Sequence, residues 1–262
     1  MKLLLSLLLV ASLVRAEDES AGAEAKKVGP GDIKIEEPGA PIDDKNVAKD
    51  YATRFKEKMK AAEAPEEKAK LLTKLGEYDH PEIYRAASRY ARNKSEAVAI
   101  AAIITCARQS KAKAKAGGFL FKAVGNEKRP AVVCALLVGM GHLGYDKKNA
   151  YKLAEKIYRR DTTETHKAAA RYFGYVKAKA AFRMLAEKLD EPKNTAPPQG
   201  RKKTPILSEE ERKKLWYEWK SAVPYVRWAL SEIVPGETFE TTLEAKMFVA
   251  DNAAKKKYRI GW

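Results

Sequence analysis

The sequence has few of the residues that most enzymes and metalloproteins depend on. It contains two cysteines, Cys106 and Cys134, and three histidines, His80, His142 and His166, which lie far apart along the 262 residues. An HExxH pair, Cys and His at metal-ligand spacing, a Gly-rich phosphate loop and a GxSxG motif are all missing. His142 is the one histidine close to an apolar stretch, where a packing or capping role is favoured over a ligand role. We therefore expect no catalytic residue, no cofactor and no metal site.

Two cysteines are also too few for a disulfide scaffold. When the repeats described below are aligned, Cys134 matches Ala101 and Cys106 matches Gly139, so the two cysteines are offset on neighbouring parallel helices. The offset amounts to about 7.5 Å of axial rise in addition to about 8–10 Å of lateral spacing, which exceeds the reach of a disulfide. The sequence predicts two buried free thiols.

A long apolar run is missing as well. The longest candidates, residues 3–14 and 131–143, fall short of the roughly 18–20 residues that a membrane span needs, so we expect no stable span. The first run lies in MKLLLSLLLVASLVRA, where Lys2 precedes it and Val14 and Ala16 stand at the positions that a signal peptidase reads. Residues 1–16 are therefore predicted to be a signal peptide, and the protein to be exported, either periplasmic or secreted. No cysteine follows the cleavage point, which argues against a lipoprotein; an uncleaved signal anchor is the alternative.

Acidic residues are outnumbered by basic ones beyond the N-terminal segment. The formal charge is +16, from 51 Lys and Arg against 35 Asp and Glu. Residues 17–45 carry a net charge of −5 and are rich in Gly, Ala and Pro, which predicts an acidic disordered segment. Residues 46–262 therefore carry +19, and we expect them to be attracted to polyanions and to acidic protein surfaces.

Apolar residues at helical spacing recur in units of two short helices. The clearest unit is residues 162–192, and the second helices of four units share one apolar signature. The first helices between them, from Ala97 and from Ala131, are more uniformly apolar, as suits helices packed between neighbours. Gly117 and Gly118 cost about 1 kcal/mol each inside a helix, so they indicate a late helix start or close packing. Such hairpins need neighbours to bury their stripes and are expected to stack. The signatures are Ile83, Ala86, Ala87 and Tyr90; Ala116, Phe119, Leu120 and Ala123; Ala150, Leu153, Ala154 and Ile157; and Ala178, Ala181, Phe182 and Leu185.

The pattern THKAAARYFGYVKAKAAFRMLAEKLD, with an Ala-rich first helix, a Gly near its end and a Leu-bearing second helix that closes on Asp, resembles a HEAT-type repeat. Thr165 and His166 stand where that family has Asp, Val and Arg. Tetratricopeptide repeats have a similar period, but their Trp, Gly, Tyr and Pro landmarks do not line up. The resemblance implies an all-α fold, a short right-handed α-solenoid of about four hairpins over residues 46–192. It also implies a protein that holds other macromolecules without chemistry of its own.

Both ends of the array are predicted to carry capping helices. At the N-terminal end, a helix after Asp43 or Asp44 places Val47, Tyr51, Phe55, Met59 and Ala62 on one stripe. Residues 193–207 form a basic, Pro-rich linker, and residues 208–262 form a Trp-rich helical cap. Its first helix opens with a capping box, Ser208 with Glu211, and Pro224 is expected to break or kink it. Its last helix is expected to present Leu243, Met247, Ala250 and Ala254 on its apolar face.

Basic residues recur at matching places in the second helices. On a helical wheel they point away from the core, and they form one positive band if the second helices line the concave surface, as the resemblance implies. The alternative is an ordinary solvated face, which is rich in Lys and Arg in any basic protein. The candidate partner-binding residues are Arg85, Arg89, Arg92, Lys111, Lys115, Lys122, Lys152, Lys156 and Arg159.

The Trp-bearing helix is a second candidate surface. Residues 213–220 mix Lys with Trp and Tyr, as single-strand binders and membrane-surface helices do. However, Trp216 and Trp219 share a face with Leu215 and Val223, so packing against the last hairpin is the favoured interpretation.

We therefore expect an exported, non-enzymatic scaffold or adaptor that binds an acidic protein partner through its second-helix face. The alternative is a binder of polyanions such as envelope polysaccharide, lipid head groups or nucleic acid, whose affinity would fall steeply with salt. An enzymatic function would need a cleft that gathers His142 with carboxylates. A further hypothesis is that the acidic residues 17–45 fold back on the basic band and screen it.

Overall fold

A computed structural model describes residues 33–159, 163–192, 208–252 and 260, and it is built from α-helices with one short pair of strands. The all-α fold class expected from the sequence is confirmed. The predicted signal peptide and the linker at 193–207 lie outside the described residues. Within the described part, no helix combines the length and apolar character needed to cross a lipid bilayer.

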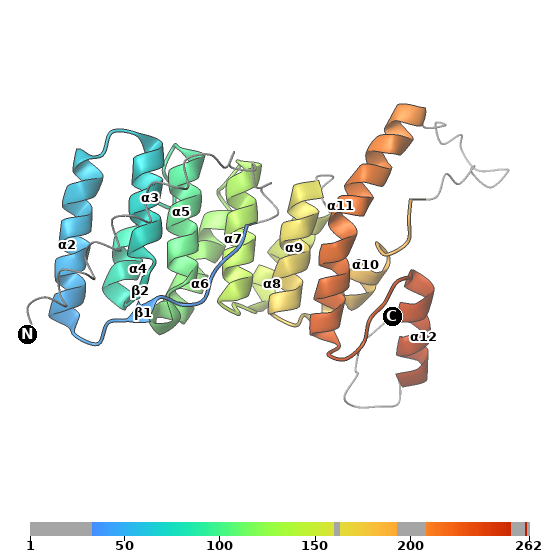
Figure 1. The fold of residues 1–262 in the computed structure, drawn as a ribbon. Coiled ribbons are helices and arrows are strands. Elements are labelled where there is room, and N and C mark those ends of the chain that lie inside the picture. The colour runs from blue at the N-terminus through green and yellow to red at the C-terminus, as the bar shows by residue number, and fades with distance from the viewer. Residues whose placement is uncertain (1–32, 160–162, 193–207, 253–259, 261–262) are drawn as a thin grey trace, which may run out of the picture.

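The helices form two layers that run across Figure 1 from blue to orange. In the first layer each helix packs on the next, in the order α3 (Pro65–Leu75), α5 (Glu96–Ala107), α7 (Pro130–His142), α9 (Thr163–Tyr175) and α11 (Glu209–Ile233). The second layer contains α4 (Pro81–Ser88), α6 (Lys113–Val124), α8 (Lys148–Tyr158) and α10 (Phe182–Ala186), each packed on the first-layer helix that follows it. Two 3-10 turns, η2 (Ser110–Ala112) and η3 (Lys179–Ala181), lead into α6 and α10. Helix α2 (Lys45–Ala61) covers α3 and α4 at one end, as expected of an N-terminal cap.

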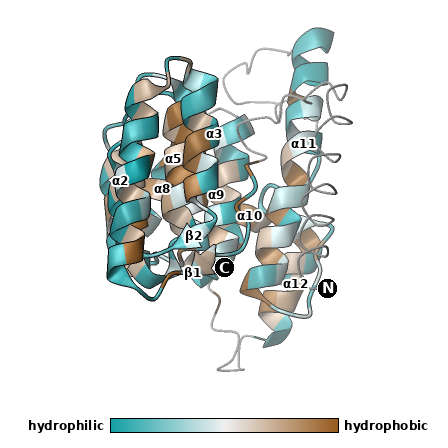
Figure 2. Ribbon diagram, turned by 60° about the vertical axis from the view of Figure 1, so that its left-hand side comes forward, coloured by the Kyte–Doolittle hydropathy of each residue, from teal (hydrophilic) through white to brown (hydrophobic). Residues whose placement is uncertain are grey.

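The core follows the predicted apolar pattern. Every residue of the four second-helix signatures is buried or half-buried against the core. Helices α5 and α7 are buried along nearly their whole length, because they have a neighbour on both sides and a second-layer helix behind; α5 is correspondingly brown in Figure 2. Of the two interpretations of Gly117, close packing is the one observed: it lies inside α6, and a Cβ there would lie 2.7 Å from the Tyr145 ring.

Two successive first-layer helices end in the same way. Beyond α7, Gly144 has a φ of 61°, its N–H donates to Gly141 O, and Tyr145 N–H donates to Met140 O. Beyond α9, Lys177 stands at the equivalent place with a φ of 51°, and its hydrogen bonds repeat the pattern. In this helix ending one residue adopts the left-handed backbone conformation. Glycine adopts it readily, whereas a residue with a side chain does so at a cost in free energy. The turn therefore recurs after two first-layer helices, and Lys177 adopts it although a side chain disfavours this conformation.

The N-terminal strap, residues 33–44, differs from the expectation that residues 17–45 are disordered. It runs along the helix ends in Figure 1, and its strand β1 (Ala40–Pro41) pairs in parallel with β2 (Tyr78–Asp79). Gly39 makes this approach possible, since a Cβ there would lie 2.4 Å from the carbonyl carbon of Glu77. Arg108 pairs with Glu36 at 3.2 Å, and Ile33 is buried. Carboxylates of the strap thus form ion pairs with cations on the helices. These partners lie far apart in the sequence, so the composition of the strap alone does not reveal them. Residues 17–32 lie outside the described residues.

Helices α2 and α11 differ from what the sequence predicted for them. In α2 the buried residues include Ala48 and Ala52, whereas Val47 and Tyr51 are exposed. Helix α11 continues through Pro224 without a break; Pro224 removes only one backbone donor, and packing on α9 holds the helix together.

Helix α12 (Thr242–Asn252) buries the other side from the one predicted. Leu243 is 65% exposed and Met247 57% exposed, so the predicted apolar face is wrong; Ala254 lies outside the described residues. The rotation of α12 is set by its start, where Thr242 donates through Oγ1 to Ala186 O at 2.7 Å and Phe239 packs edge-to-face on Phe182 and Phe248. Contacts of the first helical residue and of the loop before it therefore decide which face the helix buries.

Candidate functional site

The nine predicted basic residues, here called the basic surface, are all exposed. They do not all stand on helices: Arg89 and Arg159 cap the C-terminal ends of α4 and α8, Arg92 lies in the following turn, and Lys111 lies in η2. Helices α4 and α6 are linked by a hydrogen bond from the Tyr84 hydroxyl to Lys115 O at 3.4 Å. The basic surface therefore extends over the second-layer helices α4, α6 and α8.

Few carboxylates neutralise the basic surface. Residues 81–92, 110–124 and 146–159 together contain twelve Lys or Arg but only three Asp or Glu. Three members are in ion pairs: Arg85 with Glu82 at 2.7 Å, Lys111 with Asp43 and Arg159 with Glu155, both at 2.8 Å. The other six make no ion pair with any described residue.

Some of these cations also have a structural role. Arg85, Lys122 and Lys156 stand in the last turns of their helices, where a positive charge opposes the negative end of the helix dipole. The strap contacts one member of the basic surface, Lys111, whose ammonium also donates to Ile42 O at 3.2 Å. Within the described residues, the screening hypothesised for the acidic segment is therefore limited to the Lys111 end of the surface.

The three histidines lie in separate places. His80 caps α4 and accepts the N–H of Glu82 at 3.1 Å, and the ring of His166 stacks on Tyr158 at 5.1 Å. His142 is half-buried, with its ring at an edge-to-face distance of 5.8 Å from Tyr175. Burial lowers the pKa of His142, opposed by the charge of Glu37 on the strap. In the described part of the chain, no group of three or more His, Cys, Asp or Glu could hold a metal ion.

The Trp-bearing part of α11 is divided between packing and exposure. Trp219 is half-buried, and its indole N–H donates to Lys188 O at 3.2 Å, in agreement with a packing role. Trp216 is half-buried beneath the ammonium of Lys220, which lies 4.5 Å from its ring centroid, while Tyr217 is exposed. Trp219 therefore belongs to the junction between α10 and α11, and Trp216 to the surface.

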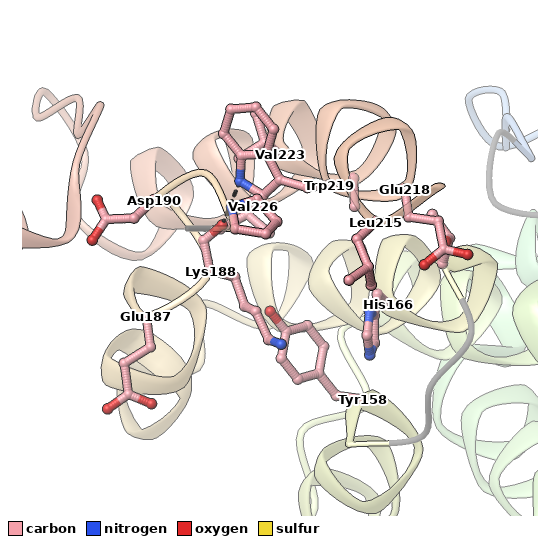
Figure 3. Close-up of a pocket in the computed structure, with 13 residues that line it drawn as sticks. Tyr158, His166, Glu187, Lys188, Asp190, Leu215, Glu218, Trp219, Val223 and Val226 are labelled. Atoms are coloured by element: carbon pink, nitrogen blue, oxygen red, sulfur yellow. Dashed lines mark hydrogen bonds between the residues drawn. The ribbon is translucent and has the colours of Figure 1, made fainter. Parts of the chain in front are cut away.

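A cleft that sequence reasoning missed opens at this junction. This α8–α11 cleft has a volume of about 360 Å³ and lies between the end of α8, the start of α9, the segment after α10 and the middle of α11 (Figure 3). Because its walls come from three helices and the segment after α10, which span residues 158–226, no local motif marks it. It is lined by Tyr158, Thr163, His166, Glu187, Lys188, Asp190, Pro192, Leu215, Glu218, Trp219, Ala222, Val223 and Val226.

Some polar groups of the α8–α11 cleft already form hydrogen bonds or ion pairs within the protein, and others do not. Glu187 pairs with Arg183 at 2.9 Å, and Asp190 accepts the N–H of Thr242 at 2.9 Å. Glu218 makes no ion pair with a described residue. The hydroxyl of Tyr158 has no hydrogen-bond partner among the described residues, although the side chain is only 2% exposed. Burial, and secondarily the charge of Glu187, raises the pKa of Tyr158, so this hydroxyl stays protonated.

Comparison of the chain with protein-family models, with curated proteins and with solved structures found no match.

Proposed function

We propose that the protein is a non-enzymatic, HEAT-like scaffold that binds an acidic protein partner through the basic surface. The observation that carries this proposal is that six of the nine exposed cations lack an ion pair with any described residue. An unpaired surface cation keeps its full electrostatic field for a partner, and a row of them steers an acidic surface towards the helices.

A binder of polyanions is the second candidate, and one observation favours it. The large apolar side chains that are exposed in the described residues stand in α2, α11 and α12, and α4, α6 and α8 contribute none. Specific protein interfaces usually have an apolar centre, whereas phosphate or sulfate polymers are bound by charge alone. The two candidates therefore predict different responses to salt.

Charge reversal combined with salt tests both candidates. The variant Arg89→Glu/Lys115→Glu/Lys152→Glu removes three unpaired cations from the basic surface. The matched control Lys49→Glu/Lys60→Glu/Lys70→Glu makes the same charge change on exposed positions of α2 and α3. Immobilised mature protein is exposed to an envelope extract and, separately, to heparin, at 50 mM and at 300 mM NaCl.

An acidic protein partner is supported if acidic proteins bind at both salt concentrations, are retained by the control variant and are lost from the basic-surface variant. Binding of heparin that falls by about two or more orders of magnitude between the two salt concentrations identifies a polyanion binder instead. Equal binding by the two variants would refute a role for the basic surface in either function.

We propose export on the basis of residues 1–16, which carry the features of a cleaved signal peptide. Expression of the full chain in a host with a secretory pathway, followed by N-terminal sequencing, tests this proposal. The expected mature terminus is Glu17, and recovery of an uncleaved chain from the cytosol would refute it.

A further inference from the structure

The α8–α11 cleft contains a tyrosine hydroxyl, that of Tyr158, that has no hydrogen-bond partner among the described residues. Tyr158 packs its ring between His166 at 5.1 Å and Phe173 at 6.1 Å, which fixes the direction of its hydroxyl. Figure 3 shows this hydroxyl directed towards the middle of the cleft. A hydroxyl that opens into a cleft without a protein partner bonds water or a ligand there. The hydroxyl of Tyr158 is therefore placed to bond a molecule in the cleft.

The α11 side of the cleft is apolar. Leu215, Val223 and Val226 line it together with Trp219, whose indole is held in place by its hydrogen bond to Lys188 O. A fixed indole offers a large apolar surface and a π-face that attracts cations. This wall suits the apolar body of a ligand, and the volume of about 360 Å³ is at the small end of the range for organic ligands.

The charges that line the cleft are mainly negative, in a chain whose net charge is +16. Glu187, Asp190 and Glu218 contribute three carboxylates, and Lys188 contributes one ammonium group. Glu218 is the carboxylate left without an ion pair or side-chain hydrogen bond to the described residues, and it stands one residue before Trp219 on α11. A cation in the cleft is therefore attracted, whereas an anion is repelled by the majority charge.

We propose that the α8–α11 cleft binds a small organic cation, an ammonium group carried on an apolar body. The apolar body lies on Trp219 and the valines, and the ammonium group donates to the Tyr158 hydroxyl oxygen while the Glu218 carboxylate attracts its charge across the cleft. The same chemistry is present in a free arylalkylamine and in the lysine side chain of a peptide.

Isothermal titration calorimetry on the mature chain with defined probes tests the proposal. The probes are tryptamine for a free amine, Nα-acetyl-lysinamide for a peptide side chain and indole-3-propionate as an anion of similar shape. We expect tryptamine or Nα-acetyl-lysinamide to bind in the micromolar to millimolar range, and the better of the two identifies the source of the amine. The anion should bind at least about tenfold more weakly, the change that one charge-assisted hydrogen bond produces.

Two variants connect the binding to the cleft. Tyr158→Phe and Glu218→Gln should each weaken amine binding by about five- to tenfold, while Glu210→Gln, an exposed change on the same helix, should not. Tyr158→Phe removes a hydroxyl that has no partner in the described residues, so its melting temperature should equal or exceed that of the wild type. Equal binding of amine and anion, no binding of either amine at 10 mM, or unchanged amine affinity in both cleft variants would overturn the proposal.

Discussion

The contact between Glu127 and Arg129 predicts a stability that depends on pH. The Glu127 carboxylate accepts two hydrogen bonds from the Arg129 guanidinium, at 2.8 and 3.0 Å, and the backbone N–H groups of Lys128 and Arg129, both at 2.9 Å. Arg129 also donates to Asn93 O at 2.8 Å and to Lys94 O at 2.9 Å. The pair therefore links the loop before α7 to the loop before α5, two first-layer helices that pack on each other.

The size of the effect follows from the pKa of Glu127. The Arg129 guanidinium, assisted by the backbone donors and opposed by partial burial, lowers the pKa of Glu127 from its ordinary 4.5 to about 2. The side chain is 13% exposed, so solvent screens the interaction little. The shift corresponds to about 3 kcal/mol of stabilisation by the ionised form. Because the folded-state pKa is depressed, this stabilisation is fully present above pH 4.5 and is lost as the pH falls towards 2.

The variant Glu127→Gln keeps the shape of the side chain but cannot ionise. Urea unfolding should show that it is less stable than the wild type by about 3 kcal/mol at pH 7, and by only about 1 kcal/mol at pH 3. The control is Glu155→Gln, which breaks an exposed pair with Arg159 and should change stability far less. A loss for Glu127→Gln that is equally large at pH 7 and pH 3 would refute the reasoning, because the effect would not come from the carboxylate charge.

Three further predictions follow from single contacts. Lys177→Gly should raise the free energy of unfolding by about 0.5–1 kcal/mol by relieving the positive φ, and Gly144→Lys should lower it; a decrease for Lys177→Gly in urea unfolding would contradict this. Gly39→Ala should push the strap away from Glu77 and cost about 1–3 kcal/mol, and it should accelerate hydrogen exchange of the Ala40 N–H, which bonds Glu77 O at 2.7 Å; unchanged protection would count against it. Cys106 and Cys134 are fully buried, and burial raises the pKa of both thiols, that of Cys134 to about 12. Both should therefore resist Ellman's reagent until denaturant is added; labelling in native buffer would disprove this.

The middle of the chain could be predicted well from its sequence. Ile83, Leu120, Ala154 and Phe182 belong to short stripes at helical spacing, and each is buried. A helix that stands between similar helices buries whatever apolar face it has, because the same neighbours recur on both sides. For the same reason the uniformly apolar helices α5 and α7 could be placed inside the array, and the two cysteines on them could be predicted to be buried.

The ends of the array could not be predicted in the same way. Leu243 and Met247 have the spacing of a buried stripe but lie exposed, because the contacts of Thr242 with Ala186 and of Phe239 with Phe182 set the rotation of α12. The strap looks mobile by composition, yet its fit depends on Gly39 meeting Glu77 and on Arg108 reaching Glu36. These contacts join residues far apart in the sequence, so no local window contains both partners.

The same division applies to the candidate sites. The sequence alone determined that the second helices of this protein would expose Lys and Arg, because the charged side chains of an amphipathic helix face the solvent. Only the tertiary structure decided that Tyr158, Glu218 and Trp219 would meet around one cleft. Helical periodicity specifies which face of each helix is buried, whereas a cleft depends on how several helices are placed relative to one another.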